Sequence, residues 1–371
     1  MIRILQIVPN MHSAGLENLL MNIYRNIDRE KVQFDFLVHY SGKYDFDDEI
    51  ERLGGRIFHF PVMENKNIIK YYKDLKVFFA THKEYKVIHG HMPSLGYLYM
   101  RAAKNAGIPV RIMHSHNASA AKTVKGQVKG LTVKIAKYPS TILLTCSEKA
   151  GRFQYGKSKF EIMHNAIDAA RFSYNETVRS DVREELNLAD RTTLLHIGRF
   201  TKQKNHLFLI SVFAEYLKIN QDSILLLMGE GELFNQIKAT VQDKGLEESV
   251  RFLGVRDDAW RIYQAADLFL LPSLHEGLPV VGIETQAAGL SSVMSSEVTQ
   301  EVDVTGLVKF LPLKKTPKEW ANEIANVINK NNKRENTYDK IVKAGYDICH
   351  EAEKIQNMYT NLYETADRGR R

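Results

Sequence analysis

Short aliphatic runs alternate with longer amphipathic stretches along the whole chain. Continuous aliphatic runs typical of buried strands lie at 2–8, 34–39, 86–91, 110–116 and 141–147, and again at 192–198, 223–229, 250–254, 267–273 and 291–296. Apolar residues at helical spacing follow in between, at 16–27, 68–82 and 95–107 and then at 206–220, 233–245 and 260–266. Such alternation predicts an α/β fold with parallel sheets that are covered by helices on both faces.

The rhythm breaks once, in the polar stretch YNETVRSDVREELNLAD, before a new aliphatic run begins. We therefore expect two doubly wound, Rossmann-like domains, an N-terminal one over 1–170 and a C-terminal one over 171–350. Residues 351–371 are expected to form a C-terminal helix that returns to the first domain. Ligands of such sheets bind at the carboxyl ends of the strands, so an interdomain cleft is expected to hold the site.

Composition places the chain among soluble globular proteins. Of its 371 residues, 44% are apolar and 26% are charged, and no run approaches the roughly 20 apolar residues of a membrane span. The first residues are too short and too weakly basic for a signal peptide. Cys146 and Cys349 lie far apart and in apolar surroundings, and we expect both as buried free thiols in a reducing, cytoplasmic location.

Charge is unevenly divided between the two halves. The first 165 residues carry 25 Lys and Arg against 14 Asp and Glu, whereas the remainder carries 26 against 30. A basic first half indicates an anionic partner there, such as lipid headgroups, phosphates or nucleic acid. The basic amphipathic segment 122–138 fits a helix on an anionic membrane and a solvated helix on its own sheet equally well. Nucleic acid is a weaker choice because the segment lacks interleaved aromatics.

The stretch HEGLPVVGIE has a glutamate near each end, Glu276 and Glu284, around a loop that leads into a helix. Gly277 allows a ligand to approach the backbone closely, and Pro279 is expected just inside the helix. The backbone amides of Gly277, Leu278 and the residues that follow Pro279 would form a nest for an anion. A diphosphate between a ribose and a second sugar would use all of these groups. The competing interpretation is a helix whose acids are merely solvated.

Two further turns follow the first strand of each domain. In HIGRFTKQKNH, Gly198 ends a strand, and Arg199 and Lys204 supply two cations that suit a diphosphate. Alone, such a loop is usually solvated surface, and its position after the first strand of the second domain is what gives it weight. In SAGLENLLMN, Gly15 opens a helix, where a plain strand–helix turn is an equally good explanation.

Four histidines end two strands of the first domain, in VIHGHMP and MHSHNAS. They are His89, His91, His114 and His116, and all four could border the cleft. Closely spaced histidines can bind zinc. No carboxylate or cysteine belongs to the group, so we expect no metal and instead a hydrogen bond to a substrate hydroxyl or a proton transfer.

With these motifs in place, the chain resembles the retaining glycosyltransferases of GT-B architecture. Within them it is similar to the bacterial exopolysaccharide and capsule family, the group 1, family 4 type. The resemblance covers nearly the full length. It rests on HEGLPVVGIE with seven residues between its glutamates, GRFTKQKN, VRIMHSHN and FDFLVHYSGKYDFDDEIERLGGRIFHFP.

The resemblance implies a role for each motif residue. Glu284 would hold the ribose hydroxyls, Glu276 would contact the donor sugar near the reacting carbon, and Arg199 and Lys204 would neutralise the leaving diphosphate. A histidine of the first domain would be catalytic; His114 is our choice, with the register against His116 left open. The other donor-binding residues would be Gly15, Gly198, Gly229, Val255, Gly277, Leu278 and Pro279, and the acceptor side would hold His89, His91, His116 and Asn117.

The implied function is transfer of a hexosyl or N-acetylhexosaminyl group, with retention, from a nucleotide-diphosphate sugar. UDP is the favoured nucleotide, and a polyprenyl-diphosphate-linked saccharide is the expected acceptor. No metal or other cofactor and no nucleic acid are expected, and the basic first domain would lie on the inner face of the cell membrane. Two alternatives stay open, a nucleotide-sugar epimerase of the same fold and a non-catalytic nucleotide- or nucleic-acid-binding protein.

Overall fold

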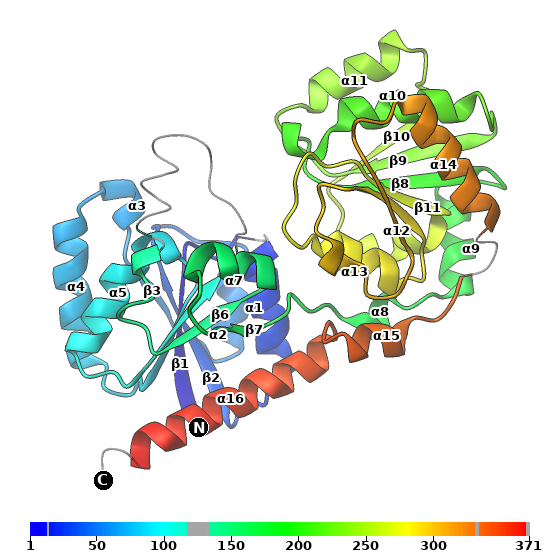
Figure 1. The fold of residues 1–371 in the computed structure, drawn as a ribbon. Helices are drawn as coiled ribbons and strands as arrows, with labels where there is room; N and C mark the ends of the chain where they lie inside the picture. The colour runs from blue at the N-terminus through cyan, green and yellow to red at the C-terminus, as the bar shows by residue number, and fades with distance from the viewer. Residues whose placement is uncertain (13–14, 117–131, 133, 331–333, 369–371) are drawn as a thin grey trace. The chain divides into compact units, whose positions relative to one another are not determined.

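The computed structural model describes residues 1–12, 15–116, 132, 134–330 and 334–368, which form two compact units (Figure 1). Unit 1 comprises Met1–Ala166 and Ile348–Arg371, and unit 2 comprises Ile167–Asp347. The sequence had placed these boundaries at 170 and 350. The last helix, α16 (Ile348–Arg368), packs within unit 1, although the whole of unit 2 precedes it in the sequence.

Unit 1 contains a parallel sheet whose seven described strands follow the order β3-β2-β1-β4-β5-β6-β7. Its strands are β1 (Ile2–Val8), β2 (Val32–Val38), β3 (Ile57–His59), β4 (Val87–Gly90), β5 (Val110–Ser115), β6 (Ile142–Thr145) and β7 (Glu161–Ile162). Besides α16, its helices are α1 (Gly15–Asn26), α2 (Asp47–Arg52), α3 (Val62–Asn65), α4 (Ile68–Thr81), α5 (Pro93–Asn105) and α7 (Glu148–Tyr155).

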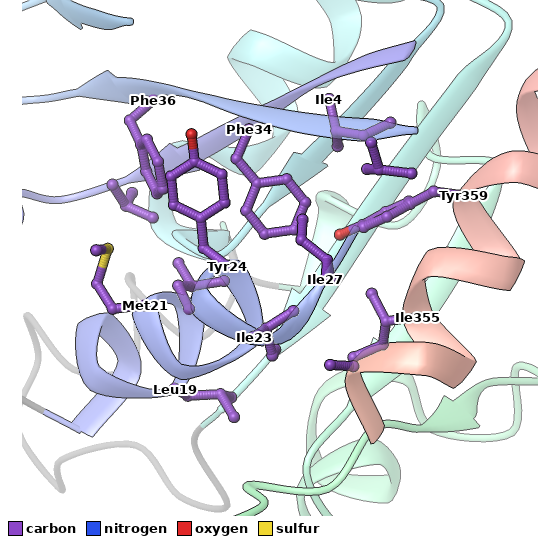
Figure 2. Close-up of a cluster of buried hydrophobic side chains, with 14 of the residues drawn as sticks. Ile4, Leu19, Met21, Ile23, Tyr24, Ile27, Phe34, Phe36, Ile355 and Tyr359 are labelled. Carbon is purple, nitrogen blue, oxygen red and sulfur yellow. The ribbon is translucent and has the colours of Figure 1, made fainter. Parts of the chain in front are cut away.

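Helices cover both faces of this sheet, which is why its central strands are mostly apolar. Helices α1 and α16 pack on one face, and α4 and α5 contribute to the core on the other. Figure 2 shows the first of these cores, where Tyr24 of α1 stacks on Phe34 of β2 with ring centroids 5.2 Å apart. Tyr359 of α16 meets Phe34 edge-on at 5.8 Å, so the returning helix is part of the core of unit 1. Burial of such aromatic rings is a major source of stabilisation.

Unit 2 repeats the architecture with a parallel sheet whose six described strands follow the order β10-β9-β8-β11-β12-β13. The strands are β8 (Thr192–Ile197), β9 (Ser223–Met228), β10 (Val250–Gly254), β11 (Leu268–Leu271), β12 (Ser292–Ser295) and β13 (Val308–Leu311). The helices are α8 (Ala169–Phe172), α9 (Glu176–Glu185), η1 (Lys202–Lys204), α10 (His206–Leu217), α11 (Phe234–Asp243), α12 (Ala259–Ala265), α13 (Val280–Ala287), η2 (Gln300–Val302), α14 (Pro317–Lys330) and α15 (Tyr338–Lys343).

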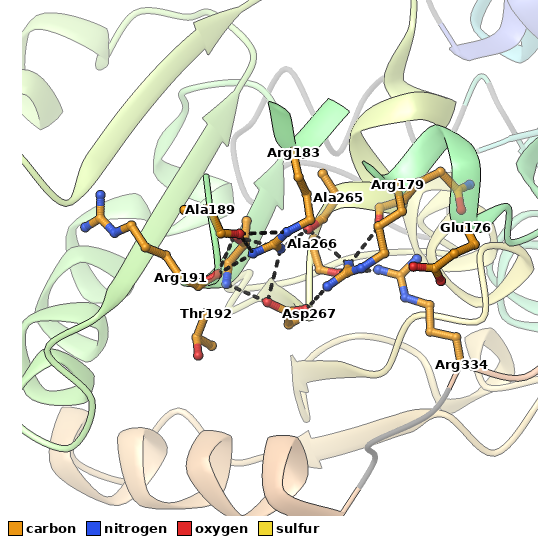
Figure 3. A network of polar contacts seen from close by, with 12 residues as sticks. Glu176, Arg179, Arg183, Ala189, Arg191, Thr192, Ala265, Ala266, Asp267 and Arg334 are labelled. Atoms are coloured by element: carbon orange, nitrogen blue, oxygen red, sulfur yellow. Dashed lines mark hydrogen bonds and ion pairs between the residues drawn. The ribbon is translucent and has the colours of Figure 1, made fainter. Parts of the chain in front are cut away.

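A network of arginine side chains lies at the amino ends of β8 and β11 in unit 2 (Figure 3). Asp267, just before β11, accepts a hydrogen bond from Arg179 of α9 at 2.6 Å and one from the backbone N–H of Thr193 at 2.7 Å. Arg183 donates to the carbonyl of Ala265 at 2.8 Å, and Arg334 donates to the carbonyl of Tyr263 at 2.9 Å. These cations are bound to backbone and carboxylate oxygens, so this edge of the sheet is structural.

The predicted alternation of strands and helices is confirmed, with three kinds of correction. Edge strands β3, β7 and β13 were not predicted. Pro279 is the N-cap of α13, one residue before the helix, and not inside it. Cys349 is exposed, whereas Cys146 is buried as expected.

Most of the basic segment 122–138, including Lys122, Lys125 and Lys129, lies outside the described residues. Among the helices that the structure describes, none is long and apolar enough to cross a membrane.

Candidate functional site

Each sheet has a point at which the order of its strands reverses. In unit 2 the chain runs outward from β8 through β9 to β10, and then crosses back to place β11 beside β8. The loops after β8 and β11 therefore leave the same edge of the sheet side by side, and such a switch point is the usual ligand site of a doubly wound fold. These two loops hold Arg199, Lys204 and Glu276.

Glu276 is the centre of the contacts between the two loops. Its Oε1 lies 2.7 Å from Nζ of Lys204 and accepts a hydrogen bond from Oγ of Ser273 at 2.9 Å. Its Oε2 accepts from Nε2 of Gln203 at 3.2 Å. The side chains of Glu276 and Lys204 are 10% and 16% exposed, so the pair is largely desolvated. The lysine expected to meet a diphosphate is thus paired with the acid expected to meet the sugar.

Arg199 provides an uncommitted positive charge at the same edge. Its side chain is exposed and makes no hydrogen bond or ion pair with any residue that the structure describes. The backbone beside it is held closely: Gly229 has φ of +135°, and a Cβ there would lie 2.4 Å from the carbonyl oxygen of Gly198. Position 229 needs glycine because the loops after β8 and β9 touch through their backbones there.

The start of α13 adds backbone donors and a second carboxylate. Gly277 and Leu278 are half-buried in the loop, and α13 begins at Val280 with its first amides outside the helical ladder. Oε2 of Glu284 accepts a hydrogen bond from the hydroxyl of Tyr263 at 2.8 Å. No described residue binds Oε1, which leaves it available to a ligand hydroxyl.

Burial raises the pKa of Glu284 to about 7. Val255, expected to border the base, is 72% exposed after β10.

In unit 1 the sheet face toward α16 changes from apolar to polar along its strands. Ile4 of β1, Val87 of β4 and Ile112 of β5 belong to the core on this face. Side chains alternate across a strand, so the residues two positions further on, Gln6, His89 and His114, continue the same face. His91 and His116 follow at the strand ends. We call His89, His91, His114 and His116 the histidine layer.

The rings of the histidine layer are packed against one another at the strand ends of unit 1. The centroids of His89 and His91 lie 4.1 Å apart, and those of His114 and His116 lie 4.0 Å apart. His89, His91 and His114 are 0%, 4% and 0% exposed, and His116 is half-buried. No described residue binds either ring nitrogen of His114, whereas Nε2 of His116 lies 3.1 Å from Nδ1 of His91.

Burial makes the histidine layer neutral. It lowers the pKa of His89, His91 and His114 well below the ordinary value of 6.5, and that of His116 to about 4. Each ring also disfavours charge on its neighbours. At neutral pH these imidazoles carry no charge, which suits contact with an uncharged hydroxyl.

Three of these rings come close enough together for a metal ion to be considered. Ring nitrogens of His89, His91 and His114 all lie within 4.8 Å of one another. The planes of His89 and His114 are inclined by only 13°, with centroids 5.3 Å apart. Imidazole lone pairs lie in the ring plane, so stacked rings do not point at one ion, and the rings would have to rotate before coordinating it.

The remaining expected positions are separate from these contacts. Gly15 opens α1 after β1, is exposed, and has no atom within 4 Å of the place where a Cβ would lie. Asn117 lies outside the described residues. Sequence reasoning missed several polar partners that hold the expected residues: Gln203 and Ser273 on Glu276, Tyr263 on Glu284, and Gln6 and Tyr359 on the histidine layer. Each is an ordinary polar residue in its segment, and nothing local distinguishes it.

Known proteins resemble the chain in sequence along nearly its whole length. Residues 178–344 match the family model described as glycosyl transferases group 1. The chain is 32% identical to a putative glycosyltransferase, EpsF, of Bacillus subtilis, over 99% of this chain and 98% of that protein. It is 26% identical to the UDP-Gal:alpha-D-GlcNAc-diphosphoundecaprenol alpha-1,3-galactosyltransferase of Escherichia coli, over 96% of each chain.

Solved structures share the fold. The Anabaena protein HepE, crystallised in complex with UDP, superposes with a TM-score of 0.77 at 17% identity, over 97% of this chain and 100% of that one. WaaG, a glycosyltransferase involved in lipopolysaccharide biosynthesis, superposes with a TM-score of 0.68 at 16% identity, over 98% of each chain. These likenesses establish the GT-B fold. Together with the full-length sequence match, they show that the chain belongs to the group 1 glycosyltransferase family.

Proposed function

We propose that the protein transfers a hexosyl or N-acetylhexosaminyl group from a UDP-sugar to a polyprenyl-diphosphate-linked saccharide in exopolysaccharide or capsule synthesis. The observation that best supports this is the Lys204–Glu276 pair, which joins the loops after β8 and β11. Arg199 lies in the same loop as Lys204, and Glu284 lies on α13, the helix that follows the β11 loop. Support for the substrate class comes from the E. coli relative, whose name specifies UDP-Gal and a diphosphoundecaprenol acceptor, and from HepE, crystallised with UDP.

Unit 2 would hold the donor. One oxygen of Glu284 is bound by Tyr263, and the other would accept from the ribose hydroxyls. Arg199 would meet the diphosphate directly, and Lys204 has ammonium hydrogens beyond the one that faces Glu276. The amides at the start of α13 would add partial positive charge.

The transfer would proceed with retention of the anomeric configuration. The bond between the anomeric carbon and the diphosphate oxygen breaks, and the acceptor hydroxyl oxygen bonds to the same face of that carbon. The hydroxyl proton passes to the departing phosphate oxygen, so that charge develops on the leaving group where Arg199 and Lys204 stabilise it. In this scheme no metal is required, because the two cations and the amides serve the diphosphate.

Unit 1 would provide the acceptor side and the contact with the membrane. Of the two histidines that the motif leaves open, His116 is half-buried and His114 is fully enclosed, so His116 is the better placed to meet a substrate hydroxyl.

On α4, Ile69 and Val77 are 73% and 64% exposed and share a helix face with Lys73 and Lys76. Apolar side chains flanked by lysines suit an anionic lipid surface.

A donor panel tests this proposal most directly. The purified protein is incubated with UDP-, GDP- and ADP-sugars, with and without a polyprenyl-diphosphate saccharide, and the products are identified by mass spectrometry and NMR. We expect slow hydrolysis of one UDP-sugar alone and transfer with retained configuration when acceptor is present. An isomerised nucleotide sugar formed without acceptor would support the epimerase instead, and binding without turnover would support the non-catalytic alternative.

Chelation addresses the metal separately. We expect turnover to be unchanged after treatment with EDTA and removal of the chelator. Loss of activity that added Mg²⁺ or Zn²⁺ restores would contradict the metal-free scheme.

A further inference from the structure

The hydrogen bonds of the histidine layer continue into the C-terminal helix. Nε2 of His116 lies 3.1 Å from Nδ1 of His91, and Nε2 of His91 lies 2.9 Å from Oε1 of Gln6. Nε2 of Gln6 donates to the hydroxyl of Tyr359 at 3.1 Å, and that hydroxyl lies 2.6 Å from Nδ1 of His89. Gln6, His89, His91 and Tyr359 are each at most 4% exposed, so their hydrogen bonds are shielded from solvent.

A chain of this kind has one direction. Because the carbonyl oxygen of Gln6 can only accept, His91 must carry its proton on Nε2. Nδ1 of His91 is then an acceptor, so His116 must carry its own proton on Nε2, which leaves Nδ1 of His116 as a bare lone pair. At the other end, the Tyr359 hydroxyl accepts from Gln6 and donates to Nδ1 of His89.

The orientation of the Gln6 amide therefore sets the tautomers of three histidines. If the amide turned over, its NH₂ group would donate to Nε2 of His91, and every bond in the chain would reverse. His116 would then receive a hydrogen bond at Nε2 and present a donor at Nδ1. A sugar hydroxyl that donates a hydrogen bond needs an acceptor, so the two directions are not equivalent for holding that hydroxyl.

We propose that Gln6 and Tyr359 are positioning residues which hold His116 in the tautomer with Nδ1 as a hydrogen-bond acceptor for a sugar hydroxyl. The role of His116 toward substrate rests on the proposed function, whereas the tautomer does not. Tyr359 anchors the amide because its hydroxyl is the acceptor that the NH₂ group of Gln6 needs. Burial keeps that hydroxyl protonated by raising its pKa. Through Tyr359, helix α16 would thus influence the reaction, although it follows the whole of unit 2 in the sequence.

The tautomers can be measured without any substrate. Protein labelled with ¹⁵N-histidine is studied by long-range ¹H–¹⁵N correlation NMR, and signals are assigned with single histidine-to-glutamine variants. In the wild type we expect His91 and His116 both protonated at Nε2. In Tyr359→Phe the amide of Gln6 loses its acceptor, so the signals of His91 and His116 should report a mixture of tautomers. Tyr363→Phe, one turn further along α16 and beside Lys86, is the matched control and should leave them unchanged.

Kinetics test the consequence for turnover. We expect Tyr359→Phe and Gln6→Met each to lower kcat by about three- to tenfold, the equivalent of one hydrogen bond, with the donor KM unchanged. Since both residues act through one chain of hydrogen bonds, kcat of the double variant should be no lower than kcat of the less active single variant. Circular dichroism and thermal melting check that each variant is folded.

Each outcome decides something different. Unchanged tautomers in Tyr359→Phe, or changed tautomers with unchanged kcat, would overturn the positioning role. A metal ion at one per chain in the purified protein, lost in His91→Gln, would also overturn it, because a coordinated Nδ1 could not accept from His116. If the wild type turned over no UDP-sugar, the proposed function would fail while the tautomer measurement still decided the inference.

Discussion

The two sheets have the same architecture, but the side chains at their carboxyl edges differ in charge. In unit 2 the loops after β8 and β11 bring together charged groups, Arg199 and the Lys204–Glu276 pair. In unit 1 the corresponding edge carries the histidine layer, whose rings are neutral because burial lowers their pKa. Charge suits a diphosphate and neutral hydrogen-bonding groups suit hydroxyls. The difference agrees with the proposed division of donor and acceptor between the two units.

The largest effect is expected from removing the cations of unit 2. Lys204→Ala and Arg199→Ala should each lower kcat by about 10²- to 10³-fold, because each removes charge that stabilises the leaving diphosphate. Lys204→Ala also leaves Glu276 without its ion pair. Lys202→Ala, on an exposed neighbour in η1, is the control and should keep near wild-type kcat. Equal losses in all three variants would mean that this loop contributes only general charge.

A smaller and pH-dependent effect is expected at Glu284. The ribose hydroxyls donate hydrogen bonds, so binding favours the ionised carboxylate, and affinity should fall as the pH drops below the pKa of about 7. Glu284→Gln should weaken UDP binding by about 10- to 100-fold, as expected for a hydrogen bond to a charged group. Calorimetric titrations with UDP between pH 6 and 8 measure both, and the glutamine variant should show a flat profile. A wild-type affinity independent of pH would contradict the ribose role.

Acid should destabilise unit 1 more than unit 2. Burial lowers the pKa of His116 to about 4, so below pH 6.5 the unfolded chain binds a proton that the folded chain refuses. Each such histidine leaves the free energy of unfolding unchanged above pH 6.5. Below that pH it lowers this free energy by about 1.4 kcal/mol per pH unit, until the pH reaches the pKa of the histidine in the folded state. The shifted histidines of unit 1 are His39, His89, His91, His114, His116 and His164, against His196 and His206 in unit 2.

The two units can be followed separately during unfolding. Trp260 and Trp320, the two tryptophans of the sequence, both lie in unit 2, so their fluorescence reports that unit alone. Far-ultraviolet circular dichroism reports both units. As the pH is lowered from 7 to 5, part of the dichroism signal, that of unit 1, should be lost under milder unfolding conditions than the fluorescence signal of unit 2. Transitions that stay coincident at every pH would argue against a difference between the units.

The smallest effect is expected on the outer surface of unit 1. Each lysine near an anionic membrane contributes about 1 kcal/mol, so Lys73→Ser and Lys76→Ser should each weaken binding to phosphatidylglycerol vesicles roughly fivefold. Lys238→Ser, on the exposed face of α11 in unit 2, is the control. Vesicle sedimentation at low and moderate salt measures the difference. If the control lowered binding equally, the surface of α4 would not be the contact.

Strands and motifs were predictable where the signal is local. The central strands are mostly apolar on both faces, so their runs stand out in the sequence, whereas edge strands β3, β7 and β13 are short and partly exposed. The motif HEGLPVVGIE was placed correctly on a loop and a helix after β11, with Pro279 shifted by one position. The pairs His89/His91 and His114/His116 were expected at strand ends because each pair ends an aliphatic run of the sequence.

Contacts between distant segments could not be predicted from the sequence. Tyr359 meets His89 across 270 positions because α16 returns to unit 1 after the whole of unit 2. Lys204 meets Glu276 because β8 pairs with β11, an order of strands that no single segment encodes.

The sequence by itself determined the alternation of elements, the carriers of charge and the family. Periodicity and composition are properties of neighbouring residues, and they survive without a fold. The tertiary structure alone decided that Lys204 pairs with Glu276, that Arg199 has no side-chain partner among the described residues, and which histidine nitrogens are joined. Strand order and burial bring the paired atoms within hydrogen-bonding distance.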